Sequence, residues 1–412
     1  MEFVLILKKK LTLASIFFTF FIDNLCWSIV FPIFAPYFLD PENKLFSPDV
    51  PLAGRTTLLG IFLMAFSLGQ FFGSPLLGEY ADRKGRKKAL AVSIFCTFLG
   101  LALSAVSMQI NSLWLLFISR LATGGFASNA SVCLASIADL SPNEKTKTKL
   151  FGYLSLFAGL AFVLGAFAGG KLSDSSLNAF FGPYLPLWLA AFLTLCNFLF
   201  IWFAFKETVE GDLNVQYNFW EGFQNIAQAL KTEKIKRIYT LYFLFVFAWT
   251  LLFQFTPVLV VERFNFTNSS IGTLAIFMGL FWALGSGYLN KFLHKRFSDR
   301  FVLEICLIAF TLVCALIAIP FHLWLMLAFL GSGVLVAGLA WPLCTGLISN
   351  LAPRQIQGKI LGISQSVQSL AMSVAPVIGG MSYQSSASPP FLLAAGAGLL
   401  ASIIYFSAVK KR

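Results

Sequence analysis

The chain has 412 residues, of which 58% are hydrophobic and 12% are charged, and its formal net charge at pH 7 is +12. Soluble domains carry about 25% charged residues, so this composition excludes an ordinary soluble globular protein. The apolar residues come in blocks of about 18 or more, the length that crosses hydrocarbon as a helix, and the sequence therefore predicts an all-α membrane protein.

Hydropathy divides the chain into twelve predicted transmembrane helices. The first is too long for a secretory signal peptide, so we expect it to remain as an uncleaved span. One long polar connection follows the sixth span, which predicts an N-terminal six-helix bundle at 1–206, a linker at 207–236 and a C-terminal six-helix bundle at 237–412. The predicted spans are 11–38, 55–78, 89–109, 113–138, 148–170, 185–205, 237–261, 269–290, 300–319, 322–347, 358–383 and 390–409.

Basic residues gather on one side of this topology. With the N-terminus in the cytoplasm, 25 of the 30 Lys and Arg residues fall in cytoplasmic segments, four (Lys44, Arg55, Lys171 and Arg263) fall outside, and Arg120 lies within the membrane. Positive charge on the cytoplasmic side is the rule in membrane proteins, so both termini are predicted to be cytoplasmic. The basic charge then follows from topology, and we expect no nucleic-acid partner.

An acidic residue lies inside the first span, in the stretch TFFIDNLCWSIVFP (19–32). Asp23 is about twelve residues into the span, roughly 18 Å along a helix and close to the bilayer midplane. A charge there costs on the order of 2.5–3.5 kcal/mol, and a carboxyl group escapes much of this cost by binding a proton. Asp23 is therefore a candidate proton site; the alternative is an acid hydrogen-bonded to Asn24 or to a neighbouring helix.

The connection between spans two and three, GEYADRKGRKK (78–88), holds seven charged residues in eleven. Its glycines permit a tight turn and close approach of helices. Its acid and bases can form charge contacts that break during a conformational change, although such a run can also be a simple positively charged loop. The candidate switch residues are Gly78, Asp82, Arg83, Gly85 and Arg86, with Asp139 from the end of span four.

Arg120 is the one basic residue that lies away from the ends of a predicted span. A guanidinium group stays charged, so it needs a carboxylate, carbonyl groups or water around it. Three hypotheses remain open: Arg120 pairs with an acid and modulates its proton affinity, binds an anionic group of a substrate, or is held by structural hydrogen bonds.

The two halves of the chain resemble each other. GEYADRKGRKK at Gly78 is echoed by GYLNKFLHKRF at Gly287, and LGAFAGG (164–170) is echoed by VAPVIGG (374–380). A repeated six-helix unit is typical of transporters, and small residues let membrane helices pack closely. The candidate packing residues are Gly165, Gly169, Gly170, Pro376, Gly379 and Gly380.

The linker contains NFWEGFQNIAQALK (218–231), in which Trp220, Phe223, Ala227 and Leu230 fall on one helical face. Such a helix can lie on the cytoplasmic membrane surface. The simpler interpretation is a tether that joins the two halves.

Several of these motifs resemble the major facilitator superfamily. The 78–88 loop matches the signature between spans two and three of that family at Gly78, Ala81, Asp82, Arg83, Gly85, Arg86 and Lys87. DNLCWSIVFPIFAP (23–36) and LFISRLATGGFAS (116–128) are similar to the first-span and fourth-span motifs of its drug–proton antiporter group. IADLSPNEK (137–145) and FKETVE (205–210) resemble the tetracycline–proton antiporter branch.

The resemblance implies a twelve-helix transporter that works by alternating access and exports drug-like or amphipathic molecules against protons, with Asp23 and Arg120 as proton-coupling residues. It further implies a monomer in a bacterial cytoplasmic membrane, and a central cavity lined by spans one, four, seven and ten. Aromatic rings and amides there suit an amphipathic ligand. The candidate substrate contacts are Asn24, Trp27, Asn129, Trp249, Gln254 and Trp341.

One position departs from the family pattern. In the antiporter motif of span five a proline follows the first glycine. In this sequence Ala166 follows Gly165 at that position. The change removes a bend-promoting residue, and the family links this motif with export. A proton-coupled importer of a nutrient, metabolite or siderophore therefore remains an alternative, and a non-transporting receptor or scaffold of the same fold is a second one.

Catalysis is not expected from this sequence. His294 and Asp299 have the His-x4-Asp spacing of some acyltransferase active sites. They lie, however, among membrane-proximal basic residues in the degenerate second copy of the signature loop. The sequence has no P-loop, zinc motif or G-x-S-x-G element, and its seven cysteines lack metal or disulfide spacing. We expect no cofactor and no metal site, so an ion or substrate gradient must supply the energy.

Overall fold

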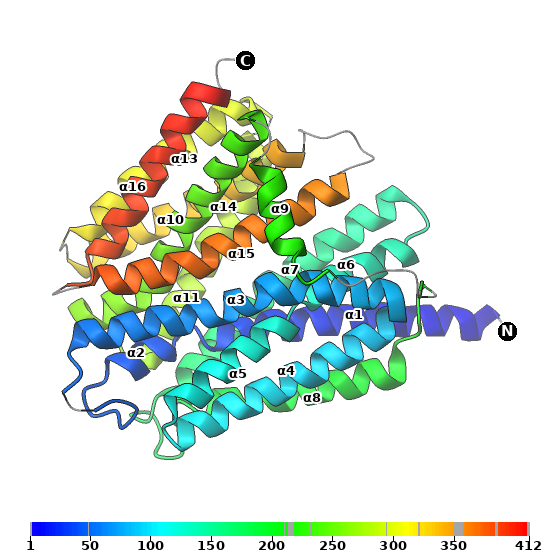
Figure 1. Ribbon diagram of the computed structural model, residues 1–412, viewed down its shortest axis with the longest axis horizontal. Helices are drawn as coiled ribbons and strands as arrows, with labels where there is room; N and C mark the ends of the chain where they lie inside the picture. Colours follow the sequence, from blue (N-terminus) through cyan, green and yellow to red (C-terminus); the bar gives the residue numbers. More distant parts are fainter. Residues whose placement is uncertain are drawn as a thin grey trace. The chain divides into compact units, whose positions relative to one another are not determined.

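The computed structural model describes residues 2–47, 49–209, 211–212, 218–230, 233–293, 295–319, 322–349, 357–383 and 386–409. Every regular element in these residues is helical, which confirms the predicted all-α class (Figure 1). The elements are α1 (Glu2–Ile29), α2 (Phe34–Leu39), α3 (Leu52–Lys84), α4 (Arg86–Gln109), α5 (Leu113–Phe126), α6 (Asn129–Leu140), α7 (Glu144–Ser173), α8 (Leu185–Ala204), α9 (Glu221–Ala229), α10 (Glu233–Phe264), α11 (Asn268–Ala283), η1 (Leu284–Leu289), α12 (Asn290–Leu293), α13 (Asp299–Ala318), α14 (Leu323–Ser349), α15 (Gln357–Ser382), α16 (Pro389–Ile404) and η3 (Tyr405–Val409).

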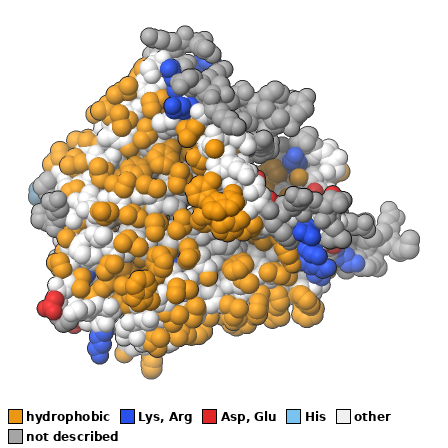
Figure 2. All heavy atoms as spheres, in the orientation of Figure 1, with side chains coloured by type: hydrophobic (Ala, Val, Ile, Leu, Met, Phe, Trp, Pro, Cys, Tyr) orange, Lys and Arg blue, Asp and Glu red, His pale blue; other side chains and the backbone are white. Residues whose placement is uncertain are grey.

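Among the described residues, 11 helical stretches are long and apolar enough to cross a membrane. They coincide with the predicted spans one to ten and twelve. The predicted span 358–383 coincides with α15, which contains several Ser and Gln residues and is not among these 11 stretches. Figure 2 shows hydrophobic side chains over most of the visible face, with charged side chains gathered toward its edges. The count of twelve spans and the cytoplasmic position of the termini stay predictions.

The contacts of the chain divide it into two units, and the first contains residues 1–34, 65–220 and 268–273. In this unit α1 packs against α6, α7 and α8, and α4 packs against α5 and α8. Ile16, Ala89, Ile94, Cys133 and Ile137 belong to its buried apolar core. These helices hold Asp23, Arg120 and the loop 78–88.

The second unit contains residues 35–64, 221–267 and 274–412. Here α10 packs against α15 and α16, and α13 packs against α14 and α16. Tyr242, Phe245, Phe310 and Phe391 are among its largest fully buried side chains. Each unit thus combines most of one predicted half with helix ends from the other, and the domain boundaries given above stay a prediction.

The glycines of LGAFAGG in α7 explain why the first turn of α11 belongs to the first unit. A Cβ at Gly165 or Gly169 would collide with backbone carbonyls of α1, so α7 and α1 touch along their backbones. Gly170 faces the other way, and a Cβ there would lie 2.8 Å from the Cα of Gly272 in α11. The first turn of α11 is also tied to α7, because Asn268 Nδ2 donates to Ser173 Oγ at 2.9 Å.

The second unit repeats this arrangement with α15. A Cβ at Gly379 would lie 2.7 Å from Leu251 Cδ2 of α10, and one at Gly380 would lie 3.2 Å from the Cα of Gly60 in α3. Gly60 in turn lies against the carbonyl of Pro376. Predicted span five therefore contacts spans one and eight, and span eleven contacts spans seven and two. The echo between the two glycine motifs has a geometric counterpart in each unit.

A further glycine contact joins α3 to α5 in the first unit. A Cβ at Gly73 would collide with the carbonyl of Gly125, and one at Gly124 would collide with the carbonyl of Phe66. Gly69 and Gly73 form a G-x-x-x-G pair on α3, the spacing that lets membrane helices approach closely. This contact positions α5, which carries Arg120.

We expect Gly73→Ala to destabilise the protein by about 1–3 kcal/mol, because the new methyl group overpacks a backbone contact. Gly78→Ala on the same helix is the matched control, since nothing lies within 4 Å of a Cβ at Gly78. Thermal unfolding in detergent, followed with a thiol-reactive dye that reports exposure of the buried cysteines, measures both. Equal melting temperatures for the two variants would contradict the packing described here.

Candidate functional site

Asp23 lies in α1 beside Asn129, the first residue of α6. The Asn129 side chain lies next to the Asp23 carboxyl group as its hydrogen-bonding neighbour. Asn129 is fully buried. Asp23 Oδ2 and Asn129 Nδ2 are both buried, yet neither completes a hydrogen bond of ordinary geometry within the described part of the chain. The structure therefore brings together one predicted proton-coupling residue and one predicted cavity residue, each with unused hydrogen-bonding capacity.

A break in predicted span four places Asn129 at this position. Helix α5 ends at Phe126 and α6 begins at Asn129. Three polar side chains from α3 and α4 make hydrogen bonds to residues at this break. Ser93 Oγ contacts the Phe126 carbonyl and Asn129 Oδ1. Gln70 Nε2 donates to Ala127 O at 3.5 Å, and the Ser74 and Ser128 hydroxyls lie 2.7 Å apart. Non-helical backbone at membrane depth is tolerated only with partners of this kind.

The other two candidates on α1 make contacts of their own. Asn24 Nδ2 donates to Phe20 O at 2.7 Å, one turn earlier on the same helix. The ring of Trp27 lies 6.0 Å from that of Phe162 on α7. Both residues are partly exposed, so neither is sealed in the core of the first unit.

Arg120 lies in α5, where it is 5% exposed. Its guanidinium carbon is 4.6 Å from the ring centroid of Phe66 and 5.4 Å from that of Phe34. Aromatic faces stabilise a desolvated cation, which gives the buried charge a favourable surrounding. The polar neighbour that the structure gives for Asp23 is Asn129.

In the second unit, two predicted cavity residues belong to one aromatic cluster. Trp249 on α10 lies 4.8 Å from Trp282 on α11, and Trp282 lies 5.9 Å from Trp341 on α14. Tyr242 extends the cluster at 6.3 Å from Trp341. Sequence reasoning missed Trp282, because span eight was not among the spans expected to line a cavity. Gln254, on α10, has a buried Oε1 without a hydrogen bond to the described residues.

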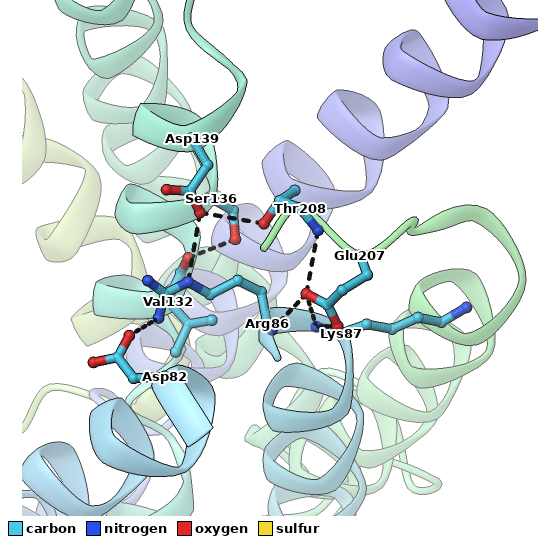
Figure 3. A network of polar contacts seen from close by, with 8 residues as sticks. All are labelled: Asp82, Arg86, Lys87, Val132, Ser136, Asp139, Glu207 and Thr208. Carbon is cyan, nitrogen blue, oxygen red and sulfur yellow. Dashed lines mark hydrogen bonds and ion pairs between the residues drawn. The ribbon is translucent and has the colours of Figure 1, made fainter. Parts of the chain in front are cut away.

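The signature loop forms a charge network around Arg86 (Figure 3). Arg86 lies between two acids, with Nη1 at 2.5 Å from Asp82 Oδ1 and Nε at 3.5 Å from Asp139 Oδ2. The expected association of Asp139 with this loop is therefore present in the geometry. Arg83 lies in the last turn of α3 and is half-buried. His294, from the catalytic alternative, lies outside the described residues.

Two residues that sequence reasoning left unassigned complete this network. Glu207 accepts hydrogen bonds from the backbone amides of Arg86 at 2.7 Å and Lys87 at 3.1 Å, at the N-terminus of α4. A carboxylate there offsets the positive end of the helix. Thr208 Oγ1 donates to Asp139 Oδ2 at 3.2 Å. The only sequence feature that could have pointed to Glu207 and Thr208 is the FKETVE stretch (205–210).

Gly85 makes this arrangement possible for two reasons. Its φ of 92° lies in the left-handed region that other residues avoid. A Cβ at this position would also collide with the Glu207 carboxylate. Glycine therefore permits both the turn between α3 and α4 and the approach of Glu207.

Comparisons with known proteins agree with this geometry. A family model described as Major Facilitator Superfamily matches residues 16–303 and 287–412. The class D tetracycline resistance protein of Salmonella ordonez is 28% identical over 335 residues, which cover 80% of each chain. Multidrug resistance protein 2 of Bacillus subtilis (strain 168) is 24% identical over 359 residues, or 86% of each chain.

Solved structures show the same fold. The human organic anion transporter TETRAN superposes with a TM-score of 0.72 at 19% identity, covering 96% of this chain and 99% of that one. The family model spans nearly the whole sequence. The chain therefore belongs to the major facilitator superfamily of membrane transporters.

Proposed function

We propose that this transporter exports small drug-like or amphipathic organic molecules in exchange for protons, by alternating access. The observation that carries the proposal is the incomplete hydrogen bonding of Asp23 and Asn129 at the break in span four. The relatives named for tetracycline and multidrug resistance support the substrate class. They are bacterial proteins, so we also propose a bacterial cytoplasmic membrane, with the monomer as the working unit.

Asp23 suits a proton site because the described residues do not fully satisfy the hydrogen bonding of its carboxyl group, so neither the charged nor the neutral form is strongly favoured. A buried carboxylate oxygen without a donor is costly, and a proton on Oδ2 removes the charge and supplies the missing hydrogen. Loss of that proton requires compensation from water or from a cationic group of the substrate. Proton binding and substrate binding then shift the same conformational equilibrium.

Helix α6 offers a physical link from this site to the signature loop. Asn129 is its first residue and Asp139 lies in its last turn. They are ten residues apart in the sequence, or about 15 Å along a helix. A shift of α6 that accompanies a change at Asp23 also moves Asp139, and so alters its contacts with Arg86 and Thr208.

The aromatic cluster of the second unit supports the proposed ligand class. Trp249, Trp282 and Trp341 bring three large flat indole rings together from three helices. Indole rings bind planar or amphipathic molecules well because each combines an apolar face with one N–H donor. Gln254 on α10 adds an unused buried acceptor in the same unit.

Import of a nutrient or metabolite is the second candidate, and Ala166 favours it. Helix α7 runs without interruption through Ala166, from Glu144 to Ser173, where the export-linked motif carries a proline. The equivalent helix α15 contains Pro376. Direction is therefore a separate question from proton coupling and has its own test.

Asp23→Asn is expected to abolish proton-driven transport and to spare passive exchange, because the amide cannot take up a proton. Proteoliposomes with an internal pH-sensitive dye and an imposed pH gradient measure proton movement on addition of tetracycline or ethidium. We expect the variant to fall to the level of empty liposomes in this assay.

Glu304→Gln is the control for Asp23→Asn, since it removes a carboxyl group from α13 in the second unit. We expect it to transport like the unmodified chain. Full proton-coupled transport by Asp23→Asn would contradict the proposed proton site. Absence of substrate-dependent proton flux from the unmodified chain across the panel would favour a non-transporting receptor.

The direction of transport is expected to be outward. Whole cells that express the chain should accumulate more ethidium or tetracycline after an uncoupler collapses the proton gradient, because export then stops. Cells with an empty vector provide the baseline. A fall in accumulation on uncoupling would identify an importer and leave the role of Asp23 intact.

Arg86→Ala is expected to change transport more than stability. Ion pairs at this degree of exposure contribute about 0–1 kcal/mol, which corresponds to a shift in a conformational equilibrium of up to about fivefold. Lys88→Ala, at an exposed position outside the network drawn in Figure 3, is the control. Initial transport rate and melting temperature are measured together. A transport rate equal to that of the control would contradict a switching role for Arg86.

A further inference from the structure

Ser93 on α4 is a buried hydroxyl group that touches two hydrogen-bond acceptors at once. Its side chain is fully buried, and Oγ makes short contacts with the Phe126 carbonyl and with Asn129 Oδ1. A serine hydroxyl carries one hydrogen and can also accept hydrogen bonds through its lone pairs. Ser93 can therefore donate to only one of these two oxygens at a time.

The Phe126 carbonyl is within reach of Ser93 because α5 ends at this residue. In a continuous helix this carbonyl would accept the backbone N–H four residues later. At the break it accepts the backbone N–H of Ser128 instead, at 2.8 Å. A carbonyl oxygen has two lone pairs, so it can accept the Ser93 hydroxyl as well. The break in span four thus gives the Ser93 hydrogen an alternative to Asn129.

The Asn129 side chain has two ends of nearly the same shape, one an acceptor and the other a donor. Rotation about its last bond exchanges the oxygen and the nitrogen. One end of this amide lies against Ser93, and the side chain is also the hydrogen-bonding neighbour of Asp23. Its Nδ2 is buried and completes no hydrogen bond of ordinary geometry within the described part of the chain. A buried donor in that situation is costly, so its orientation needs a physical reason.

Each orientation of the amide fits one charge state of Asp23. With Nδ2 toward Asp23, the nitrogen can donate to an ionised carboxylate, while Oδ1 accepts the Ser93 hydroxyl. With the amide turned over, Oδ1 can accept the hydrogen of a protonated Asp23, Nδ2 donates to Ser93 Oγ, and Ser93 donates to the Phe126 carbonyl. Both arrangements give the Asn129 oxygen and the Ser93 hydroxyl a partner.

We propose that Ser93 is a positioning residue for the proton site, because it allows the Asn129 amide to turn over as Asp23 gains or loses a proton. Ser93 acts only through Asn129, as a donor in one arrangement and as an acceptor in the other. The inference rests on the proposed function of Asp23 and adds the residue that orients its partner. The exchange needs no movement of a helix and no substrate.

Few other groups near Asp23 can titrate. The described helices that pack against α1 in this unit are α6, α7 and α8. Asp23 acts electrostatically on two thiols, those of Cys26 on α1 and Cys133 on α6. Helix α7 meets this part of α1 with Gly165 and α8 meets it with Thr194, neither of which titrates. Thiols ordinarily stay neutral below about pH 7.5, so a titration below that pH reports the carboxyl group.

The test is the titration of Asp23 in purified Ser93→Ala, followed by the infrared carbonyl band that Asp23→Asn lacks. Without the hydroxyl, the arrangement that serves a protonated Asp23 leaves an Asn129 N–H without an acceptor. The arrangement that serves the carboxylate leaves only a carbonyl without a donor, which buried sites tolerate better. We therefore expect the midpoint of protonation to fall by about 0.5–1 pH unit, a loss of about three- to tenfold in proton affinity.

Three further variants separate positioning from packing. Ser107→Ala is the matched control, since Ser107 is also a fully buried serine of α4 and donates to the Ser104 carbonyl of its own helix at 2.7 Å; we expect no shift. Ser93→Cys keeps the volume with a weaker donor and acceptor, so its midpoint should lie between those of serine and alanine. In an Asn129→Ala background, Ser93→Ala should cause no further shift, because the amide through which it acts is gone.

An unchanged midpoint in Ser93→Ala, or the same shift with and without the Asn129 amide, would overturn the positioning role and leave the proton site standing. Absence of any Asp23 band in the unmodified chain would overturn the positioning role and the proton site together. Melting temperatures are recorded for every variant. If Ser93→Ala does not fold, the comparison of Ser93→Cys with the unmodified chain decides the question in the same way.

Discussion

The structure depends on one constraint: inside hydrocarbon, every polar group needs a partner supplied by the protein. The constraint explains why the described elements are helices, and why the break at Ala127 and Ser128 is surrounded by Gln70, Ser74 and Ser93. It also explains the two aromatic rings around the guanidinium group of Arg120. Against this background the incomplete hydrogen bonding of Asp23 and Asn129 is an exception, and exceptions at membrane depth point to function.

The glycine contacts show how a rigid fold can still move. Gly379 of α15 receives the side chains of Leu251 and Phe255, but Gly165 and Gly169 of α7 and Gly380 of α15 bring helix backbones together. Such contacts are tight yet smooth, so a helix can tilt against its neighbour without repacking large residues. Helix α6, with Asn129 at one end and Asp139 near the other, lies between the proposed proton site and the Arg86 network. Proton binding and the movement of the loop can therefore share one mechanical element.

Much of the fold could be predicted from the sequence because each span must hold a long apolar block. The elements with mixed composition were harder, as α15 shows with its many Ser and Gln residues. Contacts between distant segments could not be predicted in the same way. The proximity of Asn129 to Asp23, the capping of α4 by Glu207 and the position of Trp282 between Trp249 and Trp341 depend on how helices pack. No local pattern encodes those distances.

The central claim is that Asp23 binds and releases a proton during transport. Infrared difference spectra of the purified protein, recorded with and without tetracycline or another transported compound, test it directly. The account predicts a carbonyl stretching band of a protonated carboxyl group that changes on substrate binding and is missing in Asp23→Asn. The same band in both proteins, or no carboxyl band in the unmodified chain, would contradict the account.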